Sequence, residues 1–97
     1  MRMRWLDFDY QNAGGAPNRG GVFELANRDI ETVLIDHATD VNNALMGLLR
    51  RGGPLVAKVR YVRWEEAQDA AAQAQAFLEE YQTAHGGRVP EGNAVPA

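Results

Sequence analysis

The strongest constraint on the fold is a pair of short apolar segments joined by a turn. The first covers residues 21–25 (Gly-Val-Phe-Glu-Leu), and the second covers residues 31–36, with a β-branched and aliphatic centre. Between them, residues 27–29 (Asn-Arg-Asp) have the composition of a hairpin turn. Because so few residues join the two segments, we expect them to pair as antiparallel strands. The sequence therefore predicts a β-hairpin near the start of the domain.

The hydrophobic period changes after this hairpin. From Thr39 the apolar residues recur at the spacing of an α-helix, and Thr39 or Asp40 can serve as its N-cap. Gly52 and Gly53 supply the C-terminal turn, and Pro54 prevents the helix from continuing. This pattern predicts a first helix between residues 39 and 52.

A third strand and a second helix are expected in the remainder. The strand is predicted over residues 55–64, with Lys58 and Arg60 sharing one face. The acidic pair at residues 65–66 is predicted to open the last helix, where negative charge favours the helix N-terminus. The glycine pair at residues 86–87 is predicted to end it.

This order of strand, strand, helix, strand, helix predicts a small α+β domain. Its sheet is expected to be three-stranded and mainly antiparallel, with the helices covering it. The chain has 97 residues, which suits a single domain. We expect residues 1–20 to form an N-terminal arm (a short strand or docked extended segment) and a loop, residues 21–93 to form the domain, and residues 94–97 to form a flexible tail.

Composition narrows the possible chemistry. Hydrophobic residues make up 45% of the chain and charged residues 24%, as in ordinary soluble globular proteins. The chain has no cysteine, which excludes disulfides, thiolate zinc sites and cysteine nucleophiles and favours a cytoplasmic location. There is no apolar leader and no membrane-spanning stretch. The net charge of −3 argues against a general nucleic-acid binder, and no cofactor is expected.

Three short motifs carry a resemblance to a known family. Residues 21–23 (Gly-Val-Phe) are followed by residues 34–36 (Leu-Ile-Asp), and the chain later contains residues 90–93 (Pro-Glu-Gly-Asn). This frame resembles the GIY-YIG nuclease domain, in which two strand motifs flank a short insertion and the last helix leads into a P-x-x-N end. The chain also resembles short uncharacterised relatives of that fold, through residues 21–25 and the Lys-Val-Arg run at residues 58–60.

The resemblance implies a site whose chemistry has been replaced. In the GIY-YIG family two tyrosines line the site, an arginine binds the phosphate, a glutamate holds the metal and the final asparagine supports them. The corresponding positions here are Phe23, Leu34, Ala44 and Ala74, and only Asn93 is retained. Without the hydroxyls, the guanidinium and the carboxylate, no group remains to activate water or bind a metal. The resemblance thus implies no catalytic residue and no metal site.

The basic residues of the chain suggest a second kind of candidate site, one that binds phosphate groups. The basic residues near the expected third strand could form a patch for nucleic-acid phosphates, or they could simply be an exposed sheet face and a helix end. A histidine after the second strand could contact a phosphate or act as an acid or base, although a surface histidine near a helix N-cap is the simpler interpretation. The possible phosphate contacts are His37, Arg50, Arg51, Lys58, Arg60 and Arg63.

Two further patterns are open to more than one interpretation. Asp7 and Asp9 would lie on one face of a strand, where they could bind a hard cation, but a solvated strand edge is favoured. Val62 and Trp64 would share a strand face with the basic residues Lys58 and Arg60. Apolar side chains on such a face suggest cover, either by the N-terminal arm or by a second copy of the chain. A homodimer through this face is therefore a hypothesis.

These observations favour a catalytically inactive binding or interaction module. Its ligand is unknown, and a protein partner or self-association is favoured over nucleic acid. The alternative is a divergent metal-dependent nuclease or a DNA-binding protein. An active site of that kind needs a carboxylate cluster facing Phe23 and Leu34, so the two hypotheses differ in a feature that a structure shows.

Overall fold

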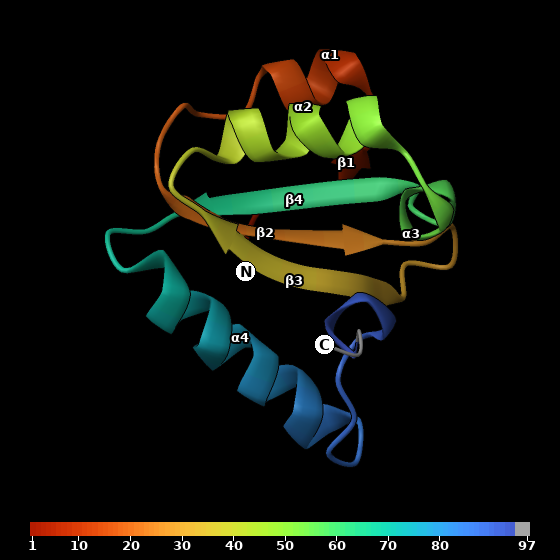
Figure 1. Ribbon diagram of the computed structural model, residues 1–97. Coiled ribbons are helices and arrows are strands. Elements are labelled where there is room, and N and C mark those ends of the chain that lie inside the picture. The colour runs from red at the N-terminus through yellow and green to blue at the C-terminus, as the bar shows by residue number, and fades with distance from the viewer. Residues whose placement is uncertain (95–97) are drawn as a thin grey trace.

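The computed structural model describes residues 1–94 and shows an α+β fold with a four-stranded antiparallel sheet. The strands lie in the order β1-β4-β2-β3 (Figure 1). Residues 95–97 of the predicted tail lie outside the described part of the chain. The strands are Leu6–Asp7 (β1), Gly21–Ala26 (β2), Thr32–Ala38 (β3) and Tyr61–Glu66 (β4). The helices are Tyr10–Gly14 (α1), Val41–Arg51 (α2), Pro54–Ala57 (α3), Ala70–Ala84 (α4) and a 3-10 turn at Glu91–Asn93 (η1).

The predicted hairpin and α+β class are confirmed. β2 pairs antiparallel with β3 on one side and with β4 on the other, so it forms the centre of the sheet. The sheet has one strand more than predicted, because Leu6 and Asp7 pair with Val62 and Tyr61 of β4. The predicted first helix is also present as α2, and the Asp40 side chain caps it by accepting from the backbone N–H of Asn43 at 2.9 Å.

The predicted starts of the third strand and of the last helix were wrong, each for a local reason. The strand predicted over residues 55–64 begins only at Tyr61, because Pro54 starts the short helix α3 after Gly53, whose φ is 105°. Proline at the first helical position is favourable, since its missing N–H would have no helical partner. The acidic pair at residues 65–66 ends β4 instead of opening a helix, because Asp69 is the N-cap of α4 and accepts from the N–H of Ala72 at 3.1 Å.

The predicted N-terminal loop also contains a helix. In α1 the side chain of Asp9 accepts from the N–H of Asn12 at 2.8 Å and acts as the N-cap. Asn42 of α2 holds the far end of α1, since its Nδ2 donates to the carbonyls of Gly14 and Ala16 at 3.0 and 2.9 Å. α1 is therefore fixed on α2 by polar contacts as well as by burial of Ala13.

The helices cover the two faces of the sheet separately. α1 and α2 lie on one face and α4 lies on the other, crossing the strands obliquely (Figure 1). Successive residues of a strand point to opposite faces, so β2 supplies apolar side chains to both cores. The core under α1 and α2 includes Phe23, Leu25, Val41, Leu45 and Val62. The smaller core under α4 includes Val22, Ile35 and Ala74, with Met1, Phe77, Leu78 and Tyr81 packed against them.

The C-terminal end of the described chain closes the outer edge of β3. The side chain of Asn93 accepts from the N–H of Ile35 at 2.9 Å and donates to the C=O of Ile35 at 2.7 Å. Gly92 lies so close to β3 that a Cβ there would be 2.7 Å from the carbonyl oxygen of Val33. An exposed strand edge is a template for unwanted pairing, and this contact occupies the edge of β3 at Ile35.

Candidate functional site

The positions that correspond to the GIY-YIG catalytic residues do not form a polar site. Phe23, Leu34 and Ala44 all belong to the apolar core under α2, whereas Ala74 lies in the core on the other face of the sheet. Phe23 has Asp36 and Trp64 as its register partners on the two neighbouring strands. Asp36 is exposed and accepts from the backbone N–H of His37 at 2.8 Å. The surroundings of Phe23 and Leu34 therefore contain no carboxylate cluster within the described residues 1–94.

The retained motif residues have structural roles in this chain. A Cβ at Gly21 would lie 2.5 Å from the carbonyl oxygen of Glu65, so this position allows β2 and β4 to approach each other. Asn93 uses both ends of its amide to close β3, as described above.

Three of the six predicted phosphate contacts lie beside carboxylates. Lys58 pairs with Glu91 of η1, and the Nε of Arg60 lies 3.9 Å from Asp7 Oδ1. Lys58 follows α3 and Arg60 precedes β4, so the prediction that the two share a strand face was wrong. Arg63 is the third paired cation of this group and lies on β4, with its side chain 23% exposed.

The other predicted phosphate contacts lie on separate elements. His37 is an exposed residue within β3 and not in the loop after it, because the strand extends to Ala38. Arg50 and Arg51 are exposed in the last turn of α2, where positive charge suits the partial negative charge of the helix C-terminus. The favourable placement of these two arginines at a helix C-terminus explains them without a phosphate ligand.

The sheet face that suggested a dimer is covered within the chain. Val62 is fully buried in the core under α1 and α2, and Trp64 is partly buried against the same core. The N-terminal arm adds to this cover, since the Sδ of Met3 accepts from the N–H of Trp64 at 3.4 Å. Of the two explanations for this face, intramolecular cover is the one that the structure supports. The two aspartates considered as a cation site also have contacts within the chain: Asp7 pairs with Arg60, and Asp9 caps α1.

An ion pair that the sequence patterns did not predict lies on the face under α4. Glu24 of β2 is only 7% exposed and lies opposite Arg63 of β4 in the sheet register. Both Nε and Nη2 of Arg63 are 2.7 Å from Glu24 Oε1, and Thr32 donates its hydroxyl to Glu24 Oε2 at 2.5 Å. The guanidinium of Arg63 also lies over the Trp5 ring, 4.2 Å from its centroid. Burial of a carboxylate is costly unless it is paired and hydrogen-bonded, and here both of its oxygens are satisfied.

A pocket of about 190 Å³ lies beside this pair, between the sheet and α4. Its floor crosses three strands, because Ile35, Glu24 and Arg63 are register partners on β3, β2 and β4. Its other walls combine apolar, aromatic and acidic side chains. The lining residues are Met1, Glu24, Ile35, Arg63, Phe77, Glu80 and Tyr81, and we call this site the Glu24–Arg63 pocket.

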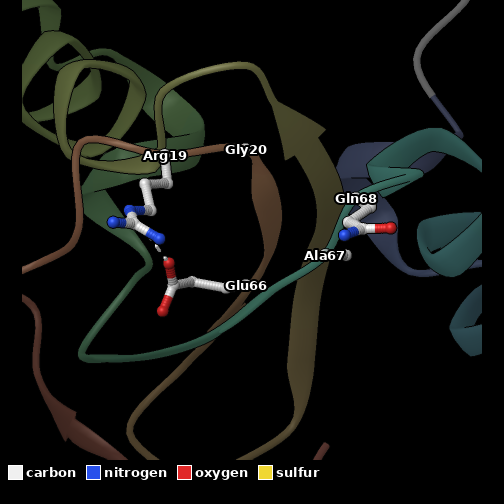
Figure 2. Close-up of a pocket in the computed structure, with 5 residues that line it drawn as sticks. All are labelled: Arg19, Gly20, Glu66, Ala67 and Gln68. Carbon is white, nitrogen blue, oxygen red and sulfur yellow. Dashed lines mark ion pairs between the residues drawn. The ribbon is translucent and has the colours of Figure 1, made fainter.

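A second, larger depression of about 480 Å³ lies at the end of β4. Figure 2 shows Arg19 and Glu66 facing each other in it, with an Nε–Oε1 distance of 3.7 Å. Both side chains are largely exposed, and Gly20, Ala67 and Gln68 complete the lining. Exposed ion pairs of this kind contribute little to binding or stability. The Glu24–Arg63 pocket is therefore the better candidate site.

The sequence contained a partial indication of the Glu24–Arg63 pocket. Glu24 is a charged residue inside an otherwise apolar strand, and a strand with six buried residues cannot leave it in solvent. Its partner was not evident, because the pairing of β2 with β4 joins residues far apart in the chain. The sequence alone therefore gives no reason to separate Arg63 from the other basic residues.

Comparisons with known proteins add a family but no activity. The family model described as "Domain of unknown function (DUF7508)" matches residues 1–84. A search of curated proteins and a search of solved structures each found no match. Within residues 1–94, no group of three acidic or histidine side chains is placed to hold a metal ion. No helix in the same part of the chain is long and apolar enough to cross a membrane.

Proposed function

Because the chain belongs to the DUF7508 family of domains of unknown function, we propose its function from its own geometry. It is a binding module with a GIY-YIG-like frame and without phosphodiesterase chemistry, and the Glu24–Arg63 pocket is its binding site. The observation that carries the proposal is the ion pair of buried Glu24 with partly exposed Arg63 at the floor of a pocket. We place the module in the cytoplasm, because a chain without cysteine suits a reducing compartment.

The apolar surroundings of the motif positions support the absence of catalysis. Phosphodiester hydrolysis needs groups that act together to activate water and to stabilise charge on phosphorus. In this chain Phe23 and Leu34 are packing residues of one core and Ala74 belongs to another. Polar residues at their positions would have to be introduced on both faces of the sheet before a site could form.

The ion pair supports binding because stability alone does not explain it. A buried ion pair is often no more stable than two apolar residues of the same size. Glu24 and Arg63 nevertheless occupy central strands, where apolar residues would pack equally well. Ligand pockets typically combine apolar walls with a few placed polar groups, and the Glu24–Arg63 pocket has both.

The partner is proposed to be a protein or small molecule and not nucleic acid or a second copy. Three of the six residues predicted to contact phosphates lie beside carboxylates, which lowers the net positive charge that a polyanion would meet there. The sheet face that suggested self-association is covered by the chain itself.

Two measurements test this proposal. The first combines a plasmid-cleavage assay with Mg²⁺ or Mn²⁺ and fluorescence anisotropy of labelled duplex, single-stranded and branched DNA at about 50 and 200 mM salt. We expect no cleavage and no salt-sensitive binding. Cleavage that depends on metal would establish the nuclease alternative and refute the proposal.

The second measurement is a screen of small molecules and short peptides by ¹⁵N chemical-shift perturbation on the full chain. We expect shifts from binders to cluster at the β2, β3 and α4 residues that line the Glu24–Arg63 pocket. Shifts that cluster on another surface would refute the assignment of the site.

A further inference from the structure

We propose that residues 1–5 form a strap that closes the Glu24–Arg63 pocket and is displaced to admit a ligand. This inference rests on the proposed function and concerns the regulation of the same site. Three observations carry it: which strands α4 leaves uncovered, how the strap is attached to the sheet, and what lies beneath it.

The strap covers the part of the sheet that α4 leaves open. α4 packs mainly on β3 and β2, and an α-helix with its side chains is about 10–12 Å wide, whereas neighbouring strands are about 4.8 Å apart. Arg63 of β4 therefore lies beside α4 and needs other cover. Trp5 supplies it, with its ring centroid 4.2 Å from Arg63 Cζ, and Met1 packs against the small core under α4. The pocket is thus bounded by the strap on one side and by α4 on the other.

The strap is attached through alternate side chains only. Its residues alternate between partly buried (Met1, Met3 and Trp5) and exposed (Arg2 and Arg4), which is the period of an extended segment. Strand pairing with β4 starts only at Leu6. Within residues 1–94, no backbone–backbone hydrogen bond joins the strap to the sheet.

Each of these side-chain contacts is weak. The Sδ of Met3 accepts from the N–H of Trp64 at 3.4 Å, and a thioether is a weak acceptor. The cation under the Trp5 ring belongs to a side chain that is 23% exposed, and cation–π contacts are weaker where water reaches the cation. Segments with few buried contacts open at a low free-energy cost, and the lids of binding sites belong to this class. The strap should therefore open far more readily than the sheet unfolds.

The floor under the strap is already formed. Glu24 and Ile35 are 7% and 6% exposed, and release of the strap removes the Met1 wall beside them. The bonds from Arg63 to Glu24 do not involve the strap, so the ion pair stays in place when Trp5 leaves. A preformed floor with a removable wall admits a ligand without unfolding the sheet, and access of this kind does not depend on the charge of the ligand.

Amide hydrogen exchange on the ¹⁵N-labelled full chain tests the strap without a ligand. The N–H of Trp64 is the direct reporter, because its acceptor is the Met3 sulfur on the strap. Relative to intrinsic rates, we expect it to exchange about tenfold or more faster than the amides of β2, which is paired on both sides. Trp5→Leu removes the ring and should accelerate Trp64 exchange about twofold to fivefold, with the β2 amides unchanged.

Two further variants make this comparison specific. Trp5→Phe keeps a ring over Arg63 and should retain most of the protection at Trp64. Tyr10→Leu is the matched control, because Tyr10 is an exposed aromatic residue of α1 on the opposite face of the sheet; it should change neither rate. Unchanged Trp64 exchange in Trp5→Leu, or equal acceleration throughout β2, would overturn the inference.

Thiol alkylation tests whether release of the strap opens the pocket. The chain has no cysteine, so Ile35→Cys places a single thiol at the pocket floor for reaction with iodoacetamide, a small neutral reagent. Adding Trp5→Leu should accelerate alkylation about twofold to fivefold, and adding Tyr10→Leu should leave the rate unchanged. Faster Trp64 exchange without faster alkylation would show that the strap moves without opening the pocket, and the inference would fail.

These results are independent of the tests of the proposed function, because neither measurement uses a ligand. A fixed strap would refute this inference while a binder at the pocket still supports the binding module. A strap that opens as expected would support it even if the screen refutes the assignment of the binding site.

Discussion

The ion pair between Glu24 and Arg63 makes a quantitative prediction about stability. In Arg63→Met the carboxylate of Glu24 stays buried and keeps only the hydroxyl of Thr32 as a partner. Removal of one partner from a buried pair costs about 3–5 kcal/mol. The side chain of Arg63 is 23% exposed, so water can reach the vacated space and the lower end of that range, about 3 kcal/mol, applies.

The complementary substitutions should cost less. In Glu24→Gln the side chain keeps its shape, and the charge left behind on Arg63 has access to water, so we expect a loss of about 1–2 kcal/mol. In the double variant Glu24→Met/Arg63→Met no uncompensated charge remains, and we expect stability within about 1 kcal/mol of the unmodified chain. Adding Glu24→Met to Arg63→Met is thus predicted to restore most of the stability that Arg63→Met alone loses.

Urea and thermal unfolding followed by circular dichroism would measure these differences. For a domain of this size about 3 kcal/mol corresponds to a fall in Tm on the order of 15 °C. Met is chosen because it fills irregular space in apolar cores. If the double variant is less stable than Arg63→Met, then lost packing and not the unpaired charge causes the loss, and the reasoning about the pair is refuted.

Three further predictions concern backbone contacts. Asn93→Asp replaces a donor to the Ile35 carbonyl by a second acceptor, and we expect a loss of about 2–3 kcal/mol in urea unfolding; an unchanged midpoint would show that this contact does not hold β3. Ile30→Asn should stabilise the chain by about 0.5–1 kcal/mol, because Ile30 has a φ of 58° that suits asparagine better than a β-branched residue, whereas Ile30→Val should give no gain. Asn42→Ala removes three contacts to carbonyls around the end of α1, so amide exchange in α1 should accelerate more than in α4, and equal protection of the two helices would contradict this role.

The parts of the fold that local patterns determine could be predicted from the sequence. The hairpin of β2 and β3 and the helix α2 follow from hydrophobic period, turn composition and the Asp40 cap. The start of β4 could not be predicted in the same way, because residues 55–59 have strand-like composition but follow a glycine and a proline that begin α3. The β-propensity of residues 55–59 favours a strand, whereas Gly53 and Pro54 favour the start of a helix. In the structure Gly53 has a positive φ and α3 begins directly after it.

The candidate site could not be predicted because it depends on register. Glu24 and Arg63 meet only after β2 pairs with β4 in one particular alignment, and a shift by one residue would place them on opposite faces. Asn93 and Ile35 also meet only in the folded chain, because 58 positions separate them. Sequence motifs located Asn93 but assigned it to a catalytic frame, whereas its contacts are those of a structural clamp.

The clamp at β3 has a consequence for how this domain is delimited. The family match ends at residue 84, before η1, so a protein cut at that boundary would lack Asn93 and its two hydrogen bonds to Ile35. β3 has seven residues and would then present an open row of backbone groups on the outside of the sheet. Such an edge can template pairing with another strand, so we expect the residues after the matched region to protect this side of the sheet.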